Sequence, residues 1–187
     1  MSRAFRLFLI LFVVMLLVDQ GSKWWAREAA MWVEGRSLYP LWPGVFELKL
    51  VYNRGVAFGM LQGKGVFMAP IALLMTGYAA WYSWKHPMER TWVHVVCGLL
   101  AAGAIGNMID RLWLGKVTDM FWIRVINFPV FNVADVCITF AGVGMVLAAL
   151  TDAAGNRPDR GGGAEASPAR RSDSDDAGDG GGDGGGD

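Results

Sequence analysis

The chain has 187 residues, of which 53% are hydrophobic and 18% charged, and its mean hydropathy is +0.32. The net charge of zero conceals two regions: residues 1–151 hold 13 Lys and Arg against eight acidic residues, and residues 152–187 hold four against nine. Soluble domains carry about 25% charged residues. The composition therefore excludes a soluble enzyme, a nucleic-acid binder with a basic face and a disulfide-stapled secreted module, and it indicates a small membrane protein.

Four apolar segments predict an all-α membrane protein with four transmembrane helices, since about 20 apolar residues cross the hydrocarbon core. The segments are Ala4–Val18, Val66–Trp84, Trp92–Ile109 and Val133–Leu150, within predicted spans of about residues 4–24, 66–84, 92–111 and 133–151. A cleavable signal peptide is the other interpretation of the first segment, but no small-residue cleavage site follows it. The nine tryptophans fall at or outside the span ends, as interfacial belts require.

The connection between the first two spans is patterned like a strand. Residues 45–52 partly alternate apolar and polar side chains after Pro40, Pro43 and Gly44. We expect a small extracytoplasmic β-containing platform at about residues 36–64. Residues 152–187 contain eleven glycines and are expected to form a disordered cytoplasmic tail beyond a single membrane domain of residues 1–151.

Charge counts lean towards one orientation without deciding it. The short loop at residues 85–91 holds Lys85 and Arg90, a denser positive charge than the longer connection at residues 19–64 carries. Because positive charge concentrates in cytoplasmic loops, both termini are expected in the cytoplasm.

Residues 1–151 contain four aspartates, and the predicted topology places all of them at the outer membrane boundary. Ionisable groups at this depth are costly and mark functional sites. Asp19 and Lys23 are four residues apart and predict an ion pair on one helix face. Asp110 is expected to organise Arg111 and the loop that follows.

Asp119 and Asp135 differ from these two aspartates, and no cation lies at helical spacing from Asp135. Asn132 is placed to cap the last helix, which leaves Asp135 in its first turn. Two poorly solvated carboxyl groups share one proton, so that one activates water while the other polarises a carbonyl, as in aspartic peptidases. Separately, a solvated loop residue and a helix cap remain the simpler interpretations of Asp119 and Asp135.

No metal site and no cofactor are expected. His94 and Cys97 share a helix face, but two ligands do not make a zinc site. Ser22 and Lys23 point about 100° apart on a helix, which argues against a Ser–Lys peptidase.

Five short motifs, in family order on the four-span frame, resemble those of the lipoprotein signal peptidases (signal peptidase II) over about residues 5–151. The motifs are Asp19-x-x-x-Lys23, Asn53-Arg-Gly55-Val-Ala57-Phe58, Gly103-x-x-Gly106-Asn107-x-x-Asp110-Arg111, Val117-Thr-Asp119 and Phe131-Asn132-Val-Ala134-Asp135.

The resemblance implies an aspartic endopeptidase of the bacterial inner membrane, with its active site at the periplasmic face, that cuts prolipoproteins just before a diacylglyceryl-modified cysteine. Asp119 and Asp135 match the catalytic pair. Residues matching positions that bind substrate or support the pair are Asn53, Gly55, Asn107, Arg111, Asn132 and Ala134, and those matching structural support are Asp19, Lys23 and Asp110.

The expected partners are prolipoproteins and membrane lipid, with no nucleic acid, and the chain is expected to act as a monomer. Two alternatives stay open: a small membrane carrier, since intramembrane aspartates also mark ion paths, and a protein that binds prolipoproteins without cutting them.

Overall fold

A computed structural model describes residues 1–55 and 65–155. Residues 56–64 and 156–187 lie outside the described residues, among them Ala57 and Phe58 of the second motif and nearly all of the predicted tail. Residues 1–155 form one compact unit.

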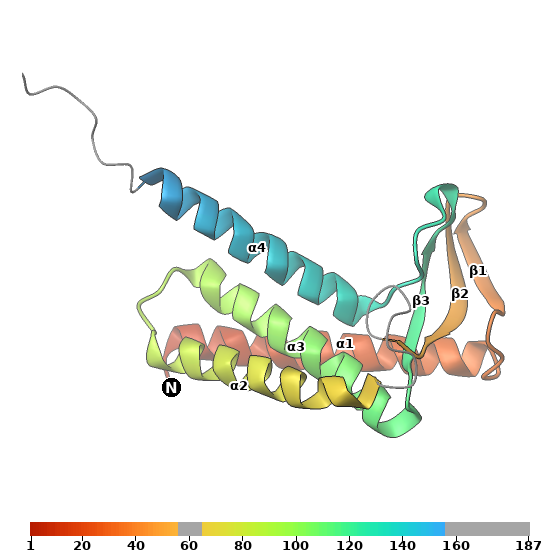
Figure 1. The fold of residues 1–187 in the computed structure, drawn as a ribbon, viewed down its shortest axis with the longest axis horizontal. Helices are drawn as coiled ribbons and strands as arrows, with labels where there is room; N and C mark the ends of the chain where they lie inside the picture. Colours follow the sequence, from red (N-terminus) through yellow and green to blue (C-terminus); the bar gives the residue numbers. More distant parts are fainter. Residues whose placement is uncertain (56–64, 156–187) are drawn as a thin grey trace, which may run out of the picture. The chain divides into compact units, whose positions relative to one another are not determined.

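Four α-helices and two short 3₁₀ helices make up most of this unit (Figure 1). The α-helices are α1 (Arg3–Ala29), α2 (Ala69–Lys85), α3 (Thr91–Leu114) and α4 (Val133–Gly155), and the 3₁₀ helices are η1 (Gly65–Met68) and η2 (Arg124–Ile126). The Ser2 hydroxyl caps α1 by accepting a hydrogen bond from Phe5 N at 3.1 Å. Gly115, with φ of 69°, ends α3 in the left-handed conformation that glycine adopts most easily.

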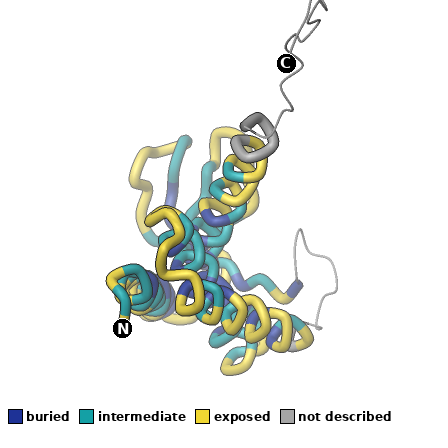
Figure 2. The backbone as a smooth tube through the Cα atoms, turned by 90° about the vertical axis from the view of Figure 1, so that its left-hand side faces the viewer, coloured by how far each residue is buried: buried dark blue, intermediate teal, exposed yellow. Residues whose placement is uncertain are grey.

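Three of the described helices, α1, α3 and α4, are long and apolar enough to cross a membrane. The predicted second span corresponds to α2, which has 17 residues and begins at Ala69 rather than at residue 66. Large apolar side chains such as Ile10, Leu17 and Leu74 are more than half exposed, and exposed residues run along the outward sides of the helices (Figure 2). Such surfaces suit contact with lipid.

The centre of the helical part is α3, which packs against the other three helices. Six of its nine buried residues are glycine or alanine, which let helices approach closely. A Cβ atom added at Gly103 would lie 2.7 Å from Ile138 Cγ1 of α4, and one added at Gly106 would collide with the Asp19 carboxylate of α1. These glycines bring the polar ends of α1, α3 and α4 together.

A three-stranded antiparallel sheet lies at one end of the helices (Figure 1), in the order β1-β2-β3. Its strands are β1 (Ser37–Trp42), β2 (Phe46–Asn53) and β3 (Val117–Ile123). The predicted platform therefore contains strands. The prediction that it is formed by the connection between the first two helices is incomplete, because that connection supplies only two of the three strands. β3 comes from the connection between α3 and α4 and pairs with β2.

The sheet is attached to α1 through a small core. Ala26 and Ala30 at the end of α1 pack against Leu50, Tyr52 and Met120 of β2 and β3. All five side chains are at most 5% exposed. This contact fixes β3 beside the C-terminal end of α1 and so determines where Asp119 lies.

Candidate functional site

Asp119 and Asp135 enter the site from different elements. Asp119 lies in the middle of β3 opposite Val51 of β2 and is 2% exposed, so its interpretation as a solvated loop residue is wrong. Asp135 lies in the first turn of α4, is partly exposed and lines a cavity.

The side chain of Asn132 links the two aspartates. Its Nδ2 donates to Asp119 Oδ1 at 2.6 Å, and its Oδ1 accepts from the Asp135 backbone N at 2.9 Å. In return, the Asn132 N–H donates to Asp135 Oδ2 at 3.2 Å, which completes a reciprocal cap of the capping-box type. The predicted cap at the start of α4 is therefore confirmed, and it brings both carboxyl groups to one fully buried residue.

Asn107 of α3 supports the pair from the helical side. Its Nδ2 donates to Asp135 Oδ1 at 2.8 Å, while its Oδ1 accepts from Asn132 Nδ2 at 3.1 Å and from Lys23 Nζ at 3.0 Å. Both amide groups therefore have fixed orientations, because the Lys23 ammonium can only donate.

The predicted Asp19–Lys23 ion pair is present, with 2.8 Å between Oδ2 and Nζ, and both side chains are at most 1% exposed. The other carboxylate oxygen of Asp19 accepts from Ala134 N at 2.8 Å, in the first turn of α4. A buried ion pair needs further hydrogen bonds to offset the loss of water, and here those bonds tie α1 to the start of α4.

Asp110 fixes a different arginine from the one predicted. Its Oδ1 lies 3.5 Å from Arg27 Nη1, and its Oδ2 accepts from Thr118 N at 2.8 Å. Adjacent residues point about 100° apart on a helix, and Arg111 Nη1 turns instead to Asn107 O at 3.3 Å. Within the part of the chain that the structure describes, the buried Arg111 Nε has no hydrogen-bond partner.

Sequence reasoning missed Arg27, one turn beyond Lys23 in α1. It is 2% exposed and donates to Thr118 Oγ1 at 2.9 Å. Its spacing from Lys23 is visible in the sequence, but its partners follow 83 and 91 residues later. Only the fold brings them together.

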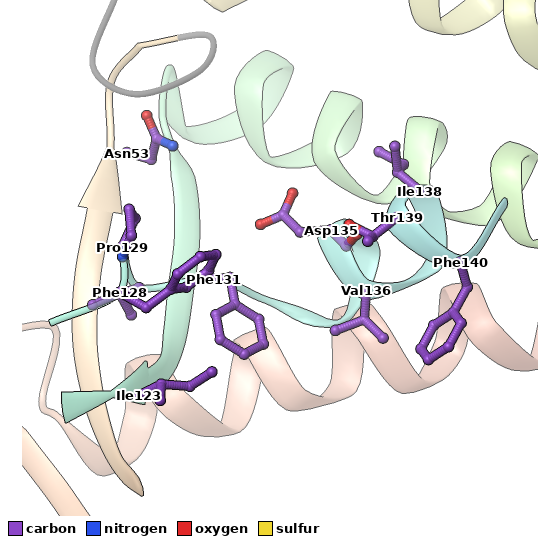
Figure 3. Close-up of a pocket in the computed structure, with 11 residues that line it drawn as sticks. Asn53, Ile123, Phe128, Pro129, Phe131, Asp135, Val136, Ile138, Thr139 and Phe140 are labelled. Atoms are coloured by element: carbon purple, nitrogen blue, oxygen red, sulfur yellow. The ribbon is translucent and has the colours of Figure 1, made fainter. Parts of the chain in front are cut away.

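Asn53 and Gly55 of the second motif lie at the end of β2, and Asn53 Oδ1 accepts from Gly55 N at 2.9 Å. Asn53 also lines the cavity that Asp135 faces. In Figure 3 the Asp135 carboxylate is directed towards the side of the cavity where Asn53 lies.

The cavity has a volume of about 510 Å³ and a mostly apolar wall (Figure 3). Its polar lining groups are Asn53, Asp135 and Thr139, and Thr139 Oγ1 is held by Asp135 O at 2.8 Å. The apolar lining residues are Ile123, Phe128, Pro129, Val130, Phe131, Val136, Ile138 and Phe140. The cavity therefore suits an extended, largely apolar chain with one polar group near Asp135.

Burial, and after it the nearby Asp135 carboxylate, together raise the pKa of Asp119 from its ordinary 3.8 to about 8. Hydrogen bonds from Asn132 and Asn53 and the charge of Lys23 act in the opposite direction. Asp119 therefore holds a proton at neutral pH. No group of three His, Cys, Asp or Glu side chains within residues 1–55 and 65–155 is arranged to hold a metal ion.

Comparison with known proteins identifies the family. A family model described as signal peptidase (SPase) II matches residues 11–151. The chain belongs to the signal peptidase II family. A lipoprotein signal peptidase of Symbiobacterium thermophilum is 41% identical over 145 residues, covering 74% of this chain and 90% of the relative. One from Streptococcus pyogenes serotype M5 is 37% identical over 142 residues, covering 76% and 90%.

Two solved structures described as bacterial membrane enzymes share the fold of this signal peptidase II family member. One has a TM-score of 0.71 at 26% identity and covers 83% of this chain and 94% of its own. The other has a TM-score of 0.67 at 28% identity, covering 78% and 93%. The prediction of a bacterial membrane signal peptidase II is confirmed at the level of the family.

Proposed function

We propose that this chain is an aspartic endopeptidase that removes signal peptides from prolipoproteins, with Asp119 and Asp135 as its catalytic pair. The observation that carries the proposal is the single buried amide of Asn132, which contacts both aspartates beside an apolar cavity. The names of the relatives, lipoprotein signal peptidases, support the substrate class.

In the proposed mechanism Asp135 is the base and Asp119 the acid. Asp135 lies in the first turn of α4, lines the cavity, and accepts hydrogen bonds from Asn107 Nδ2 and from the Asn132 backbone N. It takes a proton from a water molecule that attacks the scissile carbonyl carbon. Asp119 donates its proton to the carbonyl oxygen. The tetrahedral intermediate then collapses: the C–N bond breaks, the leaving amine takes the proton from Asp135, and a hydroxyl of the intermediate returns a proton to Asp119.

The apolar wall of the cavity suits a substrate anchored in lipid. We propose that the residues before a diacylglyceryl-modified cysteine lie along Phe128, Phe131 and Phe140, which brings the scissile bond to Asp135 at the membrane surface. Asn53 lies across the cavity from Asp135 and is positioned to hold the extended backbone. Arg111 is proposed to support the pair through Asn107, whose backbone O accepts from Arg111 Nη1 at 3.3 Å.

The pairing of β2 with β3 supports four membrane spans with the whole sheet on one side of the membrane. β2 precedes α2 and β3 follows α3, yet the two strands are neighbours in one sheet. The chain must therefore return to the same side between them, so α2 and α3 both cross the membrane or neither does. Together η1 and α2 are about 34 Å long, enough to cross about 30 Å of hydrocarbon.

We therefore propose four spans in residues 1–151, with the sheet and active site at the periplasmic face and both termini, including the tail at residues 152–187, in the cytoplasm. The chain is proposed to act as a monomer.

The test uses purified full-length protein in detergent with a diacylglyceryl-modified prolipoprotein. Asp119→Asn and Asp135→Asn should each lower kcat by about 10²–10⁴-fold, the usual contribution of a general acid or base. Glu89→Gln is the matched control, because it removes a carboxylate from the loop between α2 and α3.

Glu89→Gln should cut at the parent rate, and a precursor whose cysteine carries no diacylglycerol should resist cleavage. If either aspartate variant is folded and keeps near-parent activity, the catalytic pair is misassigned. If the folded parent binds the precursor and never cuts it, the chain is a non-catalytic binding protein.

A further inference from the structure

Arg27 is a buried cation that the proposed chemistry does not use. Its side chain is 2% exposed, although burying a guanidinium is costly unless it is paired and hydrogen-bonded. Its guanidinium carbon lies 5.4 Å from the ring centroid of Trp32 and 5.3 Å from that of Trp113, close enough to both rings for cation–π attraction. In this position Nη1 reaches Asp110 and Thr118, while the buried Nε has no hydrogen-bond partner among the described residues.

The two partners of Arg27 hold one residue between them. Arg27 Nη1 donates to the Thr118 hydroxyl at 2.9 Å, and Asp110 Oδ2 accepts from the Thr118 backbone N at 2.8 Å. Arg27 also lies 3.5 Å from the other oxygen of Asp110. Thr118 is therefore fixed at its side chain and at its backbone by two groups that also hold each other.

Thr118 immediately precedes Asp119 in β3. Successive side chains in a strand point to opposite faces, so the hydroxyl that faces Arg27 on α1 determines which way the next side chain leaves the strand. On the other face Asp119 meets Asn132 at 2.6 Å. Asp135 is held separately, by the cap of α4 and by Asn107.

We propose that Arg27 is a positioning residue for the catalytic pair, which acts through Thr118 and Asp110 to aim Asp119 at Asn132. This inference rests on the proposed function. The role needs an arginine, since a planar guanidinium stacks beside two indole rings while its Nη1 reaches Thr118 and Asp110. A lysine would keep the charge and lose that geometry.

The experiment measures kcat and KM separately for full-length variants in detergent, with the folded fraction determined for each. Arg27→Gln and Arg27→Lys should lower kcat by about 10- to 100-fold, as expected for a misplaced reacting group, and should change KM by less than about twofold. Arg36→Gln, which removes an exposed arginine between α1 and β1, should keep both constants.

Thr118 supplies a second test should the Arg27 variants fail to fold. Thr118→Ser keeps the hydroxyl and should keep kcat, whereas Thr118→Val keeps the shape, removes the hydroxyl and should lower kcat like Arg27→Gln. The double variant Arg27→Gln/Thr118→Val should lose little more than either single variant, since both break one connection.

A folded Arg27→Gln variant with parent kcat, or a Thr118→Val variant as active as Thr118→Ser, would overturn the positioning role. A rise in KM with unchanged kcat would also contradict it, because Arg27 would then bind substrate. Full activity of Arg27→Lys would reduce the role to charge alone. Failure of the proposed function is distinct: the parent itself would not cut the precursor.

Discussion

Asp119 shows how far a fold can change the behaviour of one side chain. An aspartate that is solvated in the unfolded chain becomes almost fully buried in β3, beside a second carboxylate. The folded protein therefore binds a proton at Asp119 that the unfolded chain has released at neutral pH.

This difference predicts how stability depends on pH. The pKa of Asp119 is raised from 3.8 to about 8 on folding, so between these values the folded state holds more protons than the unfolded state. The contribution of Asp119 is most favourable below pH 4 and is lost as the pH rises towards 8. Asp119→Asn should therefore raise the apparent Tm at both pH values, and the rise should be about 5–10 °C larger at pH 8.5 than at pH 5.

The measurement is thermal unfolding in detergent at both pH values, with Glu89→Gln as the control carboxylate. An equal change of Tm at pH 5 and pH 8.5 would show that Asp119 is ionised in the folded protein, and its assignment as the acid would be abandoned.

Residue spacing predicts local partners and misses distant ones. The Asp19–Lys23 pair and the Asn132 cap are both within four residues, where helix geometry alone brings the groups together. The partner of Asp110 is Arg27, 83 residues away. No spacing in the sequence distinguishes that arginine from the adjacent Arg111.

Among the elements, the helices follow from the apolar segments and β3 does not. Val117, Thr118, Asp119 and Met120 are all buried, because β3 lies between α1 on one face and the candidate site on the other. A strand covered on both faces has no alternating pattern to reveal it, and this one holds two polar residues as well. The sequence therefore predicts the strand at residues 45–52, which is β2, and it predicts neither β1 nor β3.

Asn132, at the start of α4, both caps the helix and donates its amide to Asp119 and Asn107, and two substitutions should separate these roles. Asn132→Ser keeps an oxygen that can accept from Asp135 N, and so keeps the helix cap, but it loses the amide that donates to Asp119 and Asn107. Asn132→Ala loses both. Both variants should lower kcat by about 10- to 100-fold. The free energy of unfolding of Asn132→Ser should exceed that of Asn132→Ala by about 1 kcal/mol, because only the serine keeps the cap.

Parallel unfolding and turnover measurements on the two variants provide the check. Equal stability would mean that the cap contributes nothing at this helix start. Parent-level turnover by Asn132→Ser would mean that the amide link to Asp119 is dispensable.

At the scale of the whole membrane unit, strand pairing connects sheet topology to membrane topology. β2 and β3 lie together only if the chain crosses the membrane an even number of times between them. In the proposed topology α3 is one crossing, as its apolar length allows, and α2 supplies the other. The loop at residues 86–90 then lies on the side opposite to the sheet, as the positive charges of Lys85 and Arg90 favour for a cytoplasmic loop.

Cysteine labelling distinguishes the two sides. Ser37→Cys lies on the exposed strand β1, and Met88→Cys replaces a side chain that is 94% exposed in the loop between α2 and α3. In intact spheroplasts a membrane-impermeant maleimide should label Ser37→Cys fully, and Met88→Cys only after the membrane is disrupted. The parent is the control for Cys97 and Cys137, which lie within α3 and α4. Labelling of both variants from outside would mean that α2 does not cross, and the reversed pattern would place the sheet and its aspartates in the cytoplasm.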